Sequence, residues 1–374
     1  MIKLSKSCIG KEEKLAVSEV LDNEYLGMGV NVLKFEQLLE GFFNRPVACV
    51  STGTSALQLA IQALGLNTND EILVPSITYV ASFQAISANR VKPIPCDINS
   101  KTLLIDLNDA KKKITANTKA IMPVNYAGDG SDLDEIYKFA NKYKLRVIQD
   151  SAHAFGSTFN NKLIGSFGDI SCFSFDGIKN ITSGEGGCVV SDDLNIIENI
   201  KNTRLLGVEN DTQMRYSGKR SWSFDVKHQG WRFHMSNIMA AIGIEQFKKL
   251  EVFSKKRKSL AKEYDKLLSN NSRVQKFNRN YDNINPHIYV VRIPGLRDKN
   301  LLMNLMAENK VQVGFHYFPN HLLSLYKSED VSLKVSESVF KELVTLPLHP
   351  DLNKRDVNTV IKKLNKVLDF IDEG

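Results

Sequence analysis

A carboxylate and an amine, Asp150 and Lys179, lie 29 residues apart and each follows a strand-like run. Asp150 ends the apolar run KLRVIQD and leads into the small-residue turn SAHAFGS, and Lys179 ends DISCFSFDGIK before a glycine-rich turn. A lysine amine forms imines with aldehyde cofactors, and a carboxylate beside it can keep a cofactor ring nitrogen protonated. The pair therefore predicts chemistry of the pyridoxal phosphate (PLP) kind.

The turn after another expected strand could hold a phosphate. The run RPVACVS (45–51) leads through Gly53 into a helix that starts near Thr54. Backbone N–H groups and the positive dipole end of a helix attract anions, and the hydroxyls of Thr54 and Ser55 would add donors. The same residues are also common helix caps, and the turn is neither a Walker A loop nor a GxGxxG fingerprint.

Three further side chains are ambiguous when only the residues are considered. Tyr79 in PSITYVASFQAI (75–86) lies just past an expected strand end, where an aromatic ring could stack on a flat cofactor. Tyrosines in such places are also frequently half-buried packing residues. His153 alone is typical of a hydrogen-bonded core histidine, and Ser174 of a strand serine.

The order of the expected elements predicts the fold class. From residue 45 to about 195, short β-rich runs alternate with helical runs, and two helices (11–22 and 32–43) precede them. Alternation of this kind is typical of an α/β fold with a mostly parallel sheet covered by helices. The runs are the strands EILVPS, KPIPCDI and KAIMPVNY and the helices SALQLAIQALG and DLDEIYKFANKY.

The last part of the chain predicts a smaller domain. Residues 235–268 form one long helix or two in sequence. The runs that follow are a strand at 287–294, a helix at 299–310, a strand at 311–318 and a terminal helix at 358–372. We therefore expect a large domain with the N-terminal helices over 1–250, and a small α+β domain over 251–374.

Composition indicates a globular protein and excludes several classes. Apolar residues make up 43% and charged residues 24%, as in ordinary soluble domains. The net charge of +7 is spread over helices, which favours a solvated surface over a nucleic-acid site. The scattered histidines indicate no metal site. No signal core or membrane span is recognisable, so the cytoplasm is expected. The cysteines fit free thiols in a reducing compartment: Cys8, Cys49, Cys96, Cys172 and Cys188.

Taken together, the motifs resemble one family. The chain resembles the DegT/DnrJ/EryC1/StrS family of PLP-dependent nucleotide-sugar aminotransferases over nearly its whole length. The resemblance implies PLP fold type I, like aspartate aminotransferase, with pyridoxal 5′-phosphate as cofactor and a homodimer with a shared active site. It rests on the segments STGTSAL, PSITYVASFQAI, VIQDSAHAFGS, GSFGDISCFSFDGIKNITSGEGG, MSNIMAAIGIEQ and TLPLHP, in that order.

The resemblance also implies roles around the cofactor ring. Lys179 matches the Schiff-base lysine that shuttles the proton, and Asp150 matches the partner of the pyridinium nitrogen. His153 would contact the phenolic oxygen of the ring, and Tyr79 would stack on the ring. One departure lies next to the lysine, where Asp176 replaces the histidine that is common in the family.

A second departure concerns the cofactor phosphate. Gly53, Thr54 and Ser174 match the phosphate contacts of the family. The common motif GYNYRM reads GWRFHM (230–235), so Arg232 replaces the asparagine that reaches the phosphate of the neighbouring subunit. An arginine could bind that phosphate more strongly, because it is charged and multidentate. It could instead serve assembly or bind the diphosphate of the substrate.

By resemblance, L-glutamate donates an amino group to a nucleotide-linked keto sugar. We expect a dTDP- or UDP-4-keto-6-deoxyhexose, a 4-amino-4,6-dideoxy sugar product, and a place in surface polysaccharide synthesis such as that of lipopolysaccharide O-antigen. A 3-keto sugar or an inosose stays open as acceptor. Lys179 argues against a sugar dehydratase that uses pyridoxamine phosphate, and the intact Lys179–Asp150 pair argues against a non-catalytic PLP-binding protein. His316, Tyr317 and His321 could contact the sugar or serve packing.

Overall fold

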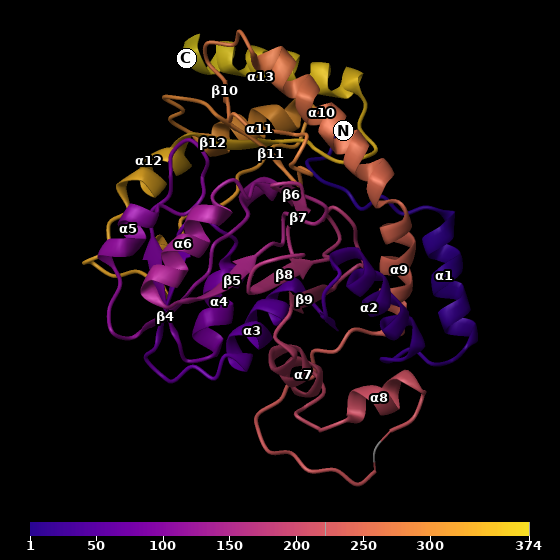
Figure 1. Cartoon of the computed structure of the whole chain (residues 1–374). Coiled ribbons are helices and arrows are strands. Elements are labelled where there is room, and N and C mark those ends of the chain that lie inside the picture. Colours follow the sequence, from indigo (N-terminus) through magenta and orange to yellow (C-terminus); the bar gives the residue numbers. More distant parts are fainter. Residues whose placement is uncertain (221, 374) are drawn as a thin grey trace.

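A seven-stranded sheet forms the centre of the larger part of the molecule in this computed structural model, which describes residues 1–220 and 222–373 (Figure 1). The spatial order is β1-β9-β8-β5-β4-β2-β3, and only β9 runs antiparallel to its neighbours. The carboxyl ends of the other strands therefore meet at one edge. The strands are β1 (Val47–Val50), β2 (Glu71–Pro75), β3 (Lys92–Cys96), β4 (Thr118–Ile121), β5 (Arg146–Asp150), β8 (Ile170–Ser174) and β9 (Gly187–Ser191).

Hydrophobic clusters lie on both faces of this sheet. Along β1, Val47 and Cys49 belong to one cluster, and Ala48 and Val50 belong to another, because successive strand residues point to opposite faces. The predicted α/β class with a mostly parallel sheet is therefore confirmed. The helices of this part are α1 (Lys11–Asp22), α2 (Val30–Phe43), α3 (Gly53–Ala63), α4 (Val80–Ala88), α5 (Leu107–Lys112), α6 (Leu133–Tyr143), α7 (Leu194–Thr203), α8 (Asp211–Tyr216) and α9 (Asn237–Lys248). A 3-10 turn η1 (Tyr126–Gly128) and a hairpin of β6 (Thr158–Phe159) and β7 (Lys162–Leu163) complete it.

A smaller unit covers one end of the large one and is drawn in orange and yellow in Figure 1. Its antiparallel sheet has the order β10-β11-β12, and its hydrophobic cluster runs from Leu260 to Leu368. A separate core supports the expected division near residue 250, which stays a prediction. The elements are α10 (Leu250–Leu268), β10 (Gln275–Lys276), β11 (Tyr289–Arg292), α11 (Lys299–Glu308), η2 (Asn320–Leu322), α12 (Lys334–Glu342), β12 (Leu343–Leu346) and α13 (Lys354–Glu373).

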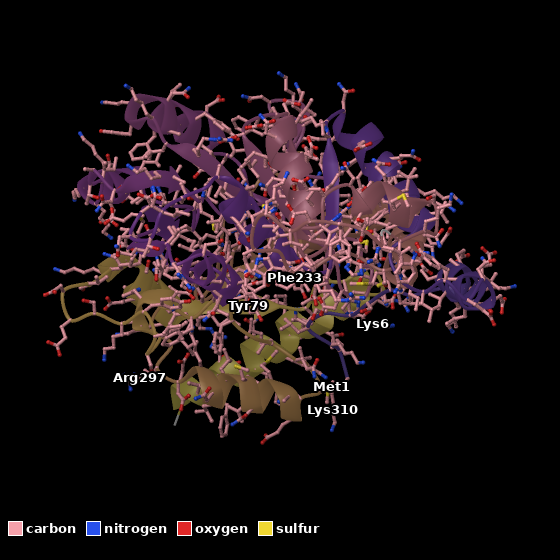
Figure 2. The ribbon with its side chains drawn as sticks, turned by 90° about the horizontal axis from the view of Figure 1, so that it is seen from below. Met1, Lys6, Tyr79, Phe233, Arg297 and Lys310 are labelled. Carbon is pink, nitrogen blue, oxygen red and sulfur yellow. The ribbon has the colours of Figure 1, made fainter. Side chains whose placement is uncertain are left out.

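The beginning of the chain contacts the small unit. The N–H of Ile2 donates to the carbonyl of Lys310 over 2.8 Å, and the N–H of Gln312 donates to the carbonyl of Ile2 over 2.9 Å. Figure 2 accordingly labels Met1 and Lys310 next to each other. The first residues thus lie beside the predicted small domain, although they precede the helices of the large one.

Two expectations about local structure are resolved. The region 235–268 is two helices, because α9 ends at Lys248 and α10 begins at Leu250. The strand predicted at 311–318 is wrong within the described chain: only Val311 and Gly314 form isolated bridges. The physical reason is that the residues after Gly314 leave the sheet, and Tyr317 bonds toward the large unit instead.

Specific hydrogen bonds hold the small unit against the carboxyl edge of the large sheet. The carboxylate of Asp97 accepts from the N–H of Ser336 over 2.7 Å, at the start of α12. The side-chain amide of Asn320 donates to the carbonyls of Ser76 over 3.0 Å and Thr78 over 2.7 Å, in the loop after β2. These contacts fix the loop that carries Tyr79.

The chain between α7 and α9 projects from the body at the bottom of Figure 1. We call the described residues 205–220 and 222–230 the projecting segment. Its base is tied to β1, because the N–H of Ser51 donates to the carbonyl of Phe233 over 2.7 Å and the N–H of Phe233 donates to Arg204 over 3.0 Å. It exposes two large aromatic side chains, Trp222 (91% exposed) and Phe224 (60% exposed).

Candidate active site

The turn after β1 is built as a helix start with free donors. Thr52 caps α3 by accepting from the N–H of Ser55 over 2.9 Å. The Ser55 hydroxyl accepts from the N–H of Thr52 and donates to the Thr52 carbonyl over 2.8 Å, so this hydroxyl holds the turn together. The N–H groups of Gly53 and Thr54 lie in the first turn, where a helix offers them no acceptor. Thr54 itself is exposed.

Two glycines allow this turn to fold over the neighbouring strand ends. A Cβ at Gly53 would lie 2.7 Å from the Cβ of Ser174, and a Cβ at Gly187 would lie 2.5 Å from the carbonyl oxygen of Thr52. Any larger residue would push the turn away from β8 and β9. As a result, Ser174 at the end of β8 lies directly beside the predicted phosphate turn.

Asp150 is a buried carboxylate at the end of β5. Its Oδ2 accepts from the hydroxyl of Ser82 over 2.7 Å, and its Oδ1 accepts from the N–H of Ala152 over 3.2 Å. Burial raises the pKa of Asp150, while these two hydrogen bonds and the charge of Lys179 act in the opposite direction. The buried carboxylate would therefore bind a cationic group strongly.

Lys179 lies in the loop that follows β8. Its N–H donates to the carbonyl of Asp176 over 3.1 Å, and its carbonyl accepts from Arg257 over 3.4 Å. Burial lowers the pKa of Lys179 to about 8, although the charges of Asp150 and Asp176 oppose this effect. Within residues 1–220 and 222–373, no hydrogen bond or ion pair engages its Nζ. Near neutral pH a useful fraction of the amine is therefore neutral and nucleophilic.

His153 is held as a neutral imidazole near Lys179. The N–H of Ala127 donates to Nδ1 over 3.3 Å, so the proton of the neutral ring is on Nε2, which lies 2.9 Å from the Tyr317 hydroxyl. Burial, followed by the charge of Lys179, holds the pKa of His153 well below its ordinary value. This side chain therefore offers an N–H donor, and Tyr317 of the small unit is its partner.

Tyr79 caps α4 and is 58% exposed. Its ring centroid lies 5.6 Å from that of Tyr317, and the planes of the two rings are tilted by 50° relative to each other. Figure 2 shows Tyr79 near the boundary between the violet ribbon of the large unit and the gold ribbon of the small unit. The exposed face of this ring is suited to stacking.

Arg232 lies on the segment that pairs with the end of β1. It forms an isolated bridge with Leu205 at the base of the projecting segment, two residues before His234, which pairs with Val50. The Arg232 side chain is exposed, and its guanidinium has no hydrogen bond or ion pair with the part of the chain that the structure describes. It is therefore free to meet a group from outside this chain.

Several residues that support the site were missed. The Thr78 hydroxyl bonds to the Ser82 hydroxyl, which in turn bonds to Asp150. The only sequence signal for Ser82 is its position one helical turn after Tyr79. The buried guanidinium of Arg257 donates to the carbonyl of Lys179, and also to the carbonyls of His287 and Leu348 over 3.1 Å each. No pattern could have identified Arg257, because its acceptors come from segments distant in sequence.

Two other kinds of feature are absent from the described residues. Among the described residues, no group of histidine, cysteine, aspartate or glutamate side chains could hold a metal ion. No helix in residues 1–220 and 222–373 is long and apolar enough to cross a membrane.

Comparisons with known proteins agree on one family. A model described as the DegT/DnrJ/EryC1/StrS aminotransferase family matches residues 7–365. The uncharacterized protein MJ1066 of Methanocaldococcus jannaschii is 33% identical, covering 97% of this chain and 96% of its own length. The spore coat polysaccharide biosynthesis protein SpsC of Bacillus subtilis is 29% identical, with the same coverages.

Solved structures match equally well. Helicobacter pylori PseC, an aminotransferase involved in the biosynthesis of pseudoaminic acid, superposes with a TM-score of 0.91 at 28% identity, covering 98% of this chain and 99% of its own. Spr1654 of Streptococcus pneumoniae, described as a putative sugar aminotransferase, superposes in its PMP form with a TM-score of 0.92 at 27% identity, covering 99% of this chain and 100% of its own.

Proposed function

Because the chain belongs to the DegT/DnrJ/EryC1/StrS aminotransferase family, we propose that it transfers an amino group from L-glutamate to a nucleotide-linked keto sugar. Glutamate leaves as 2-oxoglutarate, and the carbonyl carbon of the sugar receives the amino group. We take a dTDP- or UDP-4-keto-6-deoxyhexose as the acceptor and a 4-amino-4,6-dideoxy sugar as the product. The name of SpsC, a spore coat polysaccharide biosynthesis protein, supports a role in surface polysaccharide synthesis, for which we take O-antigen as the example.

The cofactor is pyridoxal 5′-phosphate, and the residues at the strand ends fit it. Lys179 supplies an amine whose Nζ bonds to none of the described residues, and Asp150 supplies a buried carboxylate. The turn at Gly53 supplies unpaired N–H groups next to Ser174. When bound, the cofactor supplies an electron sink for the carbon that carries the amino group.

Each residue near the cofactor ring has a defined task in this proposal. Lys179 in its neutral form removes a proton from the donor carbon that carries the amino group. In the half-reaction with the sugar it returns a proton to the carbon that receives the amino group. Asp150 holds the proton of the ring nitrogen by charge and hydrogen bonding. Tyr79 covers one face of the ring. We assign His153 to the phenolic oxygen, as a donor kept neutral by burial whose Nε2–H exchanges the Tyr317 hydroxyl for that oxygen when the cofactor binds.

We assign the cofactor phosphate to residues of two subunits. Gly53 and Thr54 would donate backbone N–H groups, and Thr54 and Ser174 would add their hydroxyls. Ser55 supports the turn by its hydrogen bonds to Thr52. The exposed Arg232 of the partner copy would complete the phosphate site. A charged, forked side chain there suits an oxyanion.

A homodimer is the assembly that we propose. The projecting segment exposes Trp222 and Phe224, and its base pairs with the end of β1 just before the phosphate turn, so we assign these side chains to the contact with the partner copy. In a twofold dimer the same segment of each copy would cross to the other, which places Arg232 near the second site.

The observation that carries the proposal is the Lys179–Asp150 pair: a carboxylate at the end of β5, and an amine in the loop after the adjacent β8 whose pKa is lowered to about 8. This pair serves equally for a 3-keto sugar or an inosose, so these acceptors remain the alternative. The residues named above do not discriminate between carbon positions, because they contact the cofactor and not the sugar.

An absorbance experiment tests donor and acceptor together. Purified enzyme should show the visible band of its bound cofactor, L-glutamate should bleach it, and one member of a panel of dTDP- and UDP-keto sugars should restore it. Restoration only by a 3-keto sugar or an inosose would establish the alternative. Absence of any band after PLP is added would overturn the aminotransferase assignment.

A further inference from the structure

Asp150 lies at the end of a chain of buried hydroxyl groups. The Ser82 hydroxyl is 2.7 Å from Asp150 Oδ2, and the Thr78 hydroxyl is 2.9 Å from the Ser82 oxygen. Because the buried carboxylate acts as acceptor, the Ser82 proton points to Asp150. The only proton left for the second bond is that of Thr78, so Thr78 donates to Ser82. The direction of both hydrogen bonds is thus determined.

The same chain continues into the small unit through the backbone. The carbonyl of Thr78 accepts from the side-chain amide of Asn320 over 2.7 Å. Thr78, Ser82 and Asn320 are all buried, so water does not compete for these hydrogen bonds. Thr78 also directly precedes Tyr79. The loop that presents the stacking ring and the hydroxyl that reaches the carboxylate are therefore fixed together.

We propose that Ser82 is a positioning residue for Asp150, whose hydroxyl, oriented by Thr78, keeps the carboxylate ionised and turned toward the cofactor ring. The inference rests on the proposed role of Asp150 at the ring nitrogen. A serine that only packed within α4 could bond to a backbone carbonyl one turn back, as serine hydroxyls in helices commonly do. Ser82 bonds across to β5 instead.

The expected size of the effect follows from the charge. Hydrogen bonds to a charged group contribute enough to change an equilibrium by roughly tenfold to a hundredfold. Burial already raises the pKa of Asp150, so loss of the Ser82 donor makes the neutral acid more favourable. A neutral Asp150 attracts the ring nitrogen proton less, and the cofactor should bind more weakly.

The test measures PLP affinity of the full-length apoprotein by absorbance titration. Ser82→Ala should raise the Kd for PLP by about tenfold, and Thr78→Val by about threefold because it removes only the orienting donor. Ser171→Ala is the matched control. Ser171 is equally buried on β8 and bonds to Gln149, away from Asp150, so its Kd should be unchanged.

A double-mutant cycle separates this inference from the proposed function. If Ser82 acts through Asp150, Ser82→Ala should have little effect on the Kd for PLP in the Asp150→Asn background. In the otherwise unchanged enzyme, Ser82→Ala should lower kcat without changing the KM for glutamate. An equal effect in both backgrounds, or no effect of Ser82→Ala at all, would overturn the inference. An Asp150→Asn protein with normal PLP affinity would instead overturn the role of Asp150.

Discussion

Lys179 and Lys299 are two lysines whose pKa burial lowers to about 8, but their surroundings differ. Lys179 has the carboxylates of Asp150 and Asp176 nearby, which oppose the effect of burial. The Nζ of Lys299 instead lies 3.5 Å from the ring centroid of Phe340. Charge and burial therefore both set the pKa of Lys179. Burial alone lowers the pKa of Lys299, which thus serves as an internal reference.

The first prediction uses this pair. In the apoprotein, both amines should react with acetic anhydride with midpoints near pH 8, because only the neutral amine is nucleophilic. Asp150→Asn removes a negative neighbour that stabilises the Lys179 ammonium, so the Lys179 midpoint should fall while that of Lys299 stays. Competitive labelling with mass spectrometry gives both values. A Lys179 midpoint that rises or does not move contradicts the electrostatic account.

The second prediction concerns Arg232, whose side chain is exposed at the base of the projecting segment. Arg232→Ala should raise the Kd for PLP by about tenfold, the size expected for a lost charged hydrogen bond. Arg297→Ala removes the same charge from an exposed site on the small unit and should leave the Kd unchanged. If only the KM for the sugar nucleotide rises, Arg232 binds the substrate diphosphate.

At the scale of elements, a buried ion pair connects α2 with the base of the projecting segment. Nη1 of Arg204 lies 2.6 Å from Oε1 of Glu36, and the side chains are 0% and 2% exposed. Tyr216, at the end of α8, donates to the same carboxylate, and Glu36 also accepts from the N–H of Cys49 on β1 over 2.7 Å. Three elements around the phosphate turn therefore share one carboxylate.

The third prediction follows from this burial. Glu36→Gln leaves the Arg204 guanidinium without its counter-charge in a dry site, which should lower the free energy of unfolding by about 3 kcal/mol. Glu40→Gln is the matched control one turn further along α2, where the pair with Lys201 is 3.9 Å long and partly exposed. It should change stability by less than about 0.5 kcal/mol. Urea unfolding of both variants measures the difference, and equal losses would contradict a special role of Glu36.

At the scale of the whole molecule, the projecting segment and α13 lie at opposite ends (Figure 1). Both expose a large aromatic side chain, Trp222 at 91% and Phe370 at 64%. Exposure alone therefore does not distinguish an interface from an ordinary surface. The projecting segment differs because its base pairs with the strand that precedes the phosphate turn.

The fourth prediction tests the assembly through this difference. Trp222→Glu should shift the protein from dimer to monomer in analytical ultracentrifugation, because an interface core does not tolerate an unpaired charge. Phe370→Glu should leave the dimer intact. A Trp222→Glu protein that remains dimeric would exclude the projecting segment as an important part of the interface.

Much of the fold could be predicted because its signals are local. The strand before Asp150 and the helices at 11–22 and 32–43 are strong periodic patterns, and the structure confirms them with small shifts of their ends. The run 311–318 also looked like a strand. It failed because Tyr317 bonds to His153 of the large unit, and alternation of residue types contains no information about such a partner.

By itself, the sequence determined the residues from which we propose the chemistry of this protein: a lysine and a carboxylate after neighbouring strands, a glycine turn before a helix, and an aromatic residue at a strand end. These depend on residue type and short spacing, which a chain displays directly. Only the tertiary structure decided what surrounds them. Ser82 reaches Asp150, Arg257 holds the Lys179 carbonyl, and Tyr317 orients His153 across 164 residues. Such contacts depend on how distant segments pack, and the sequence order does not specify that packing in any local pattern.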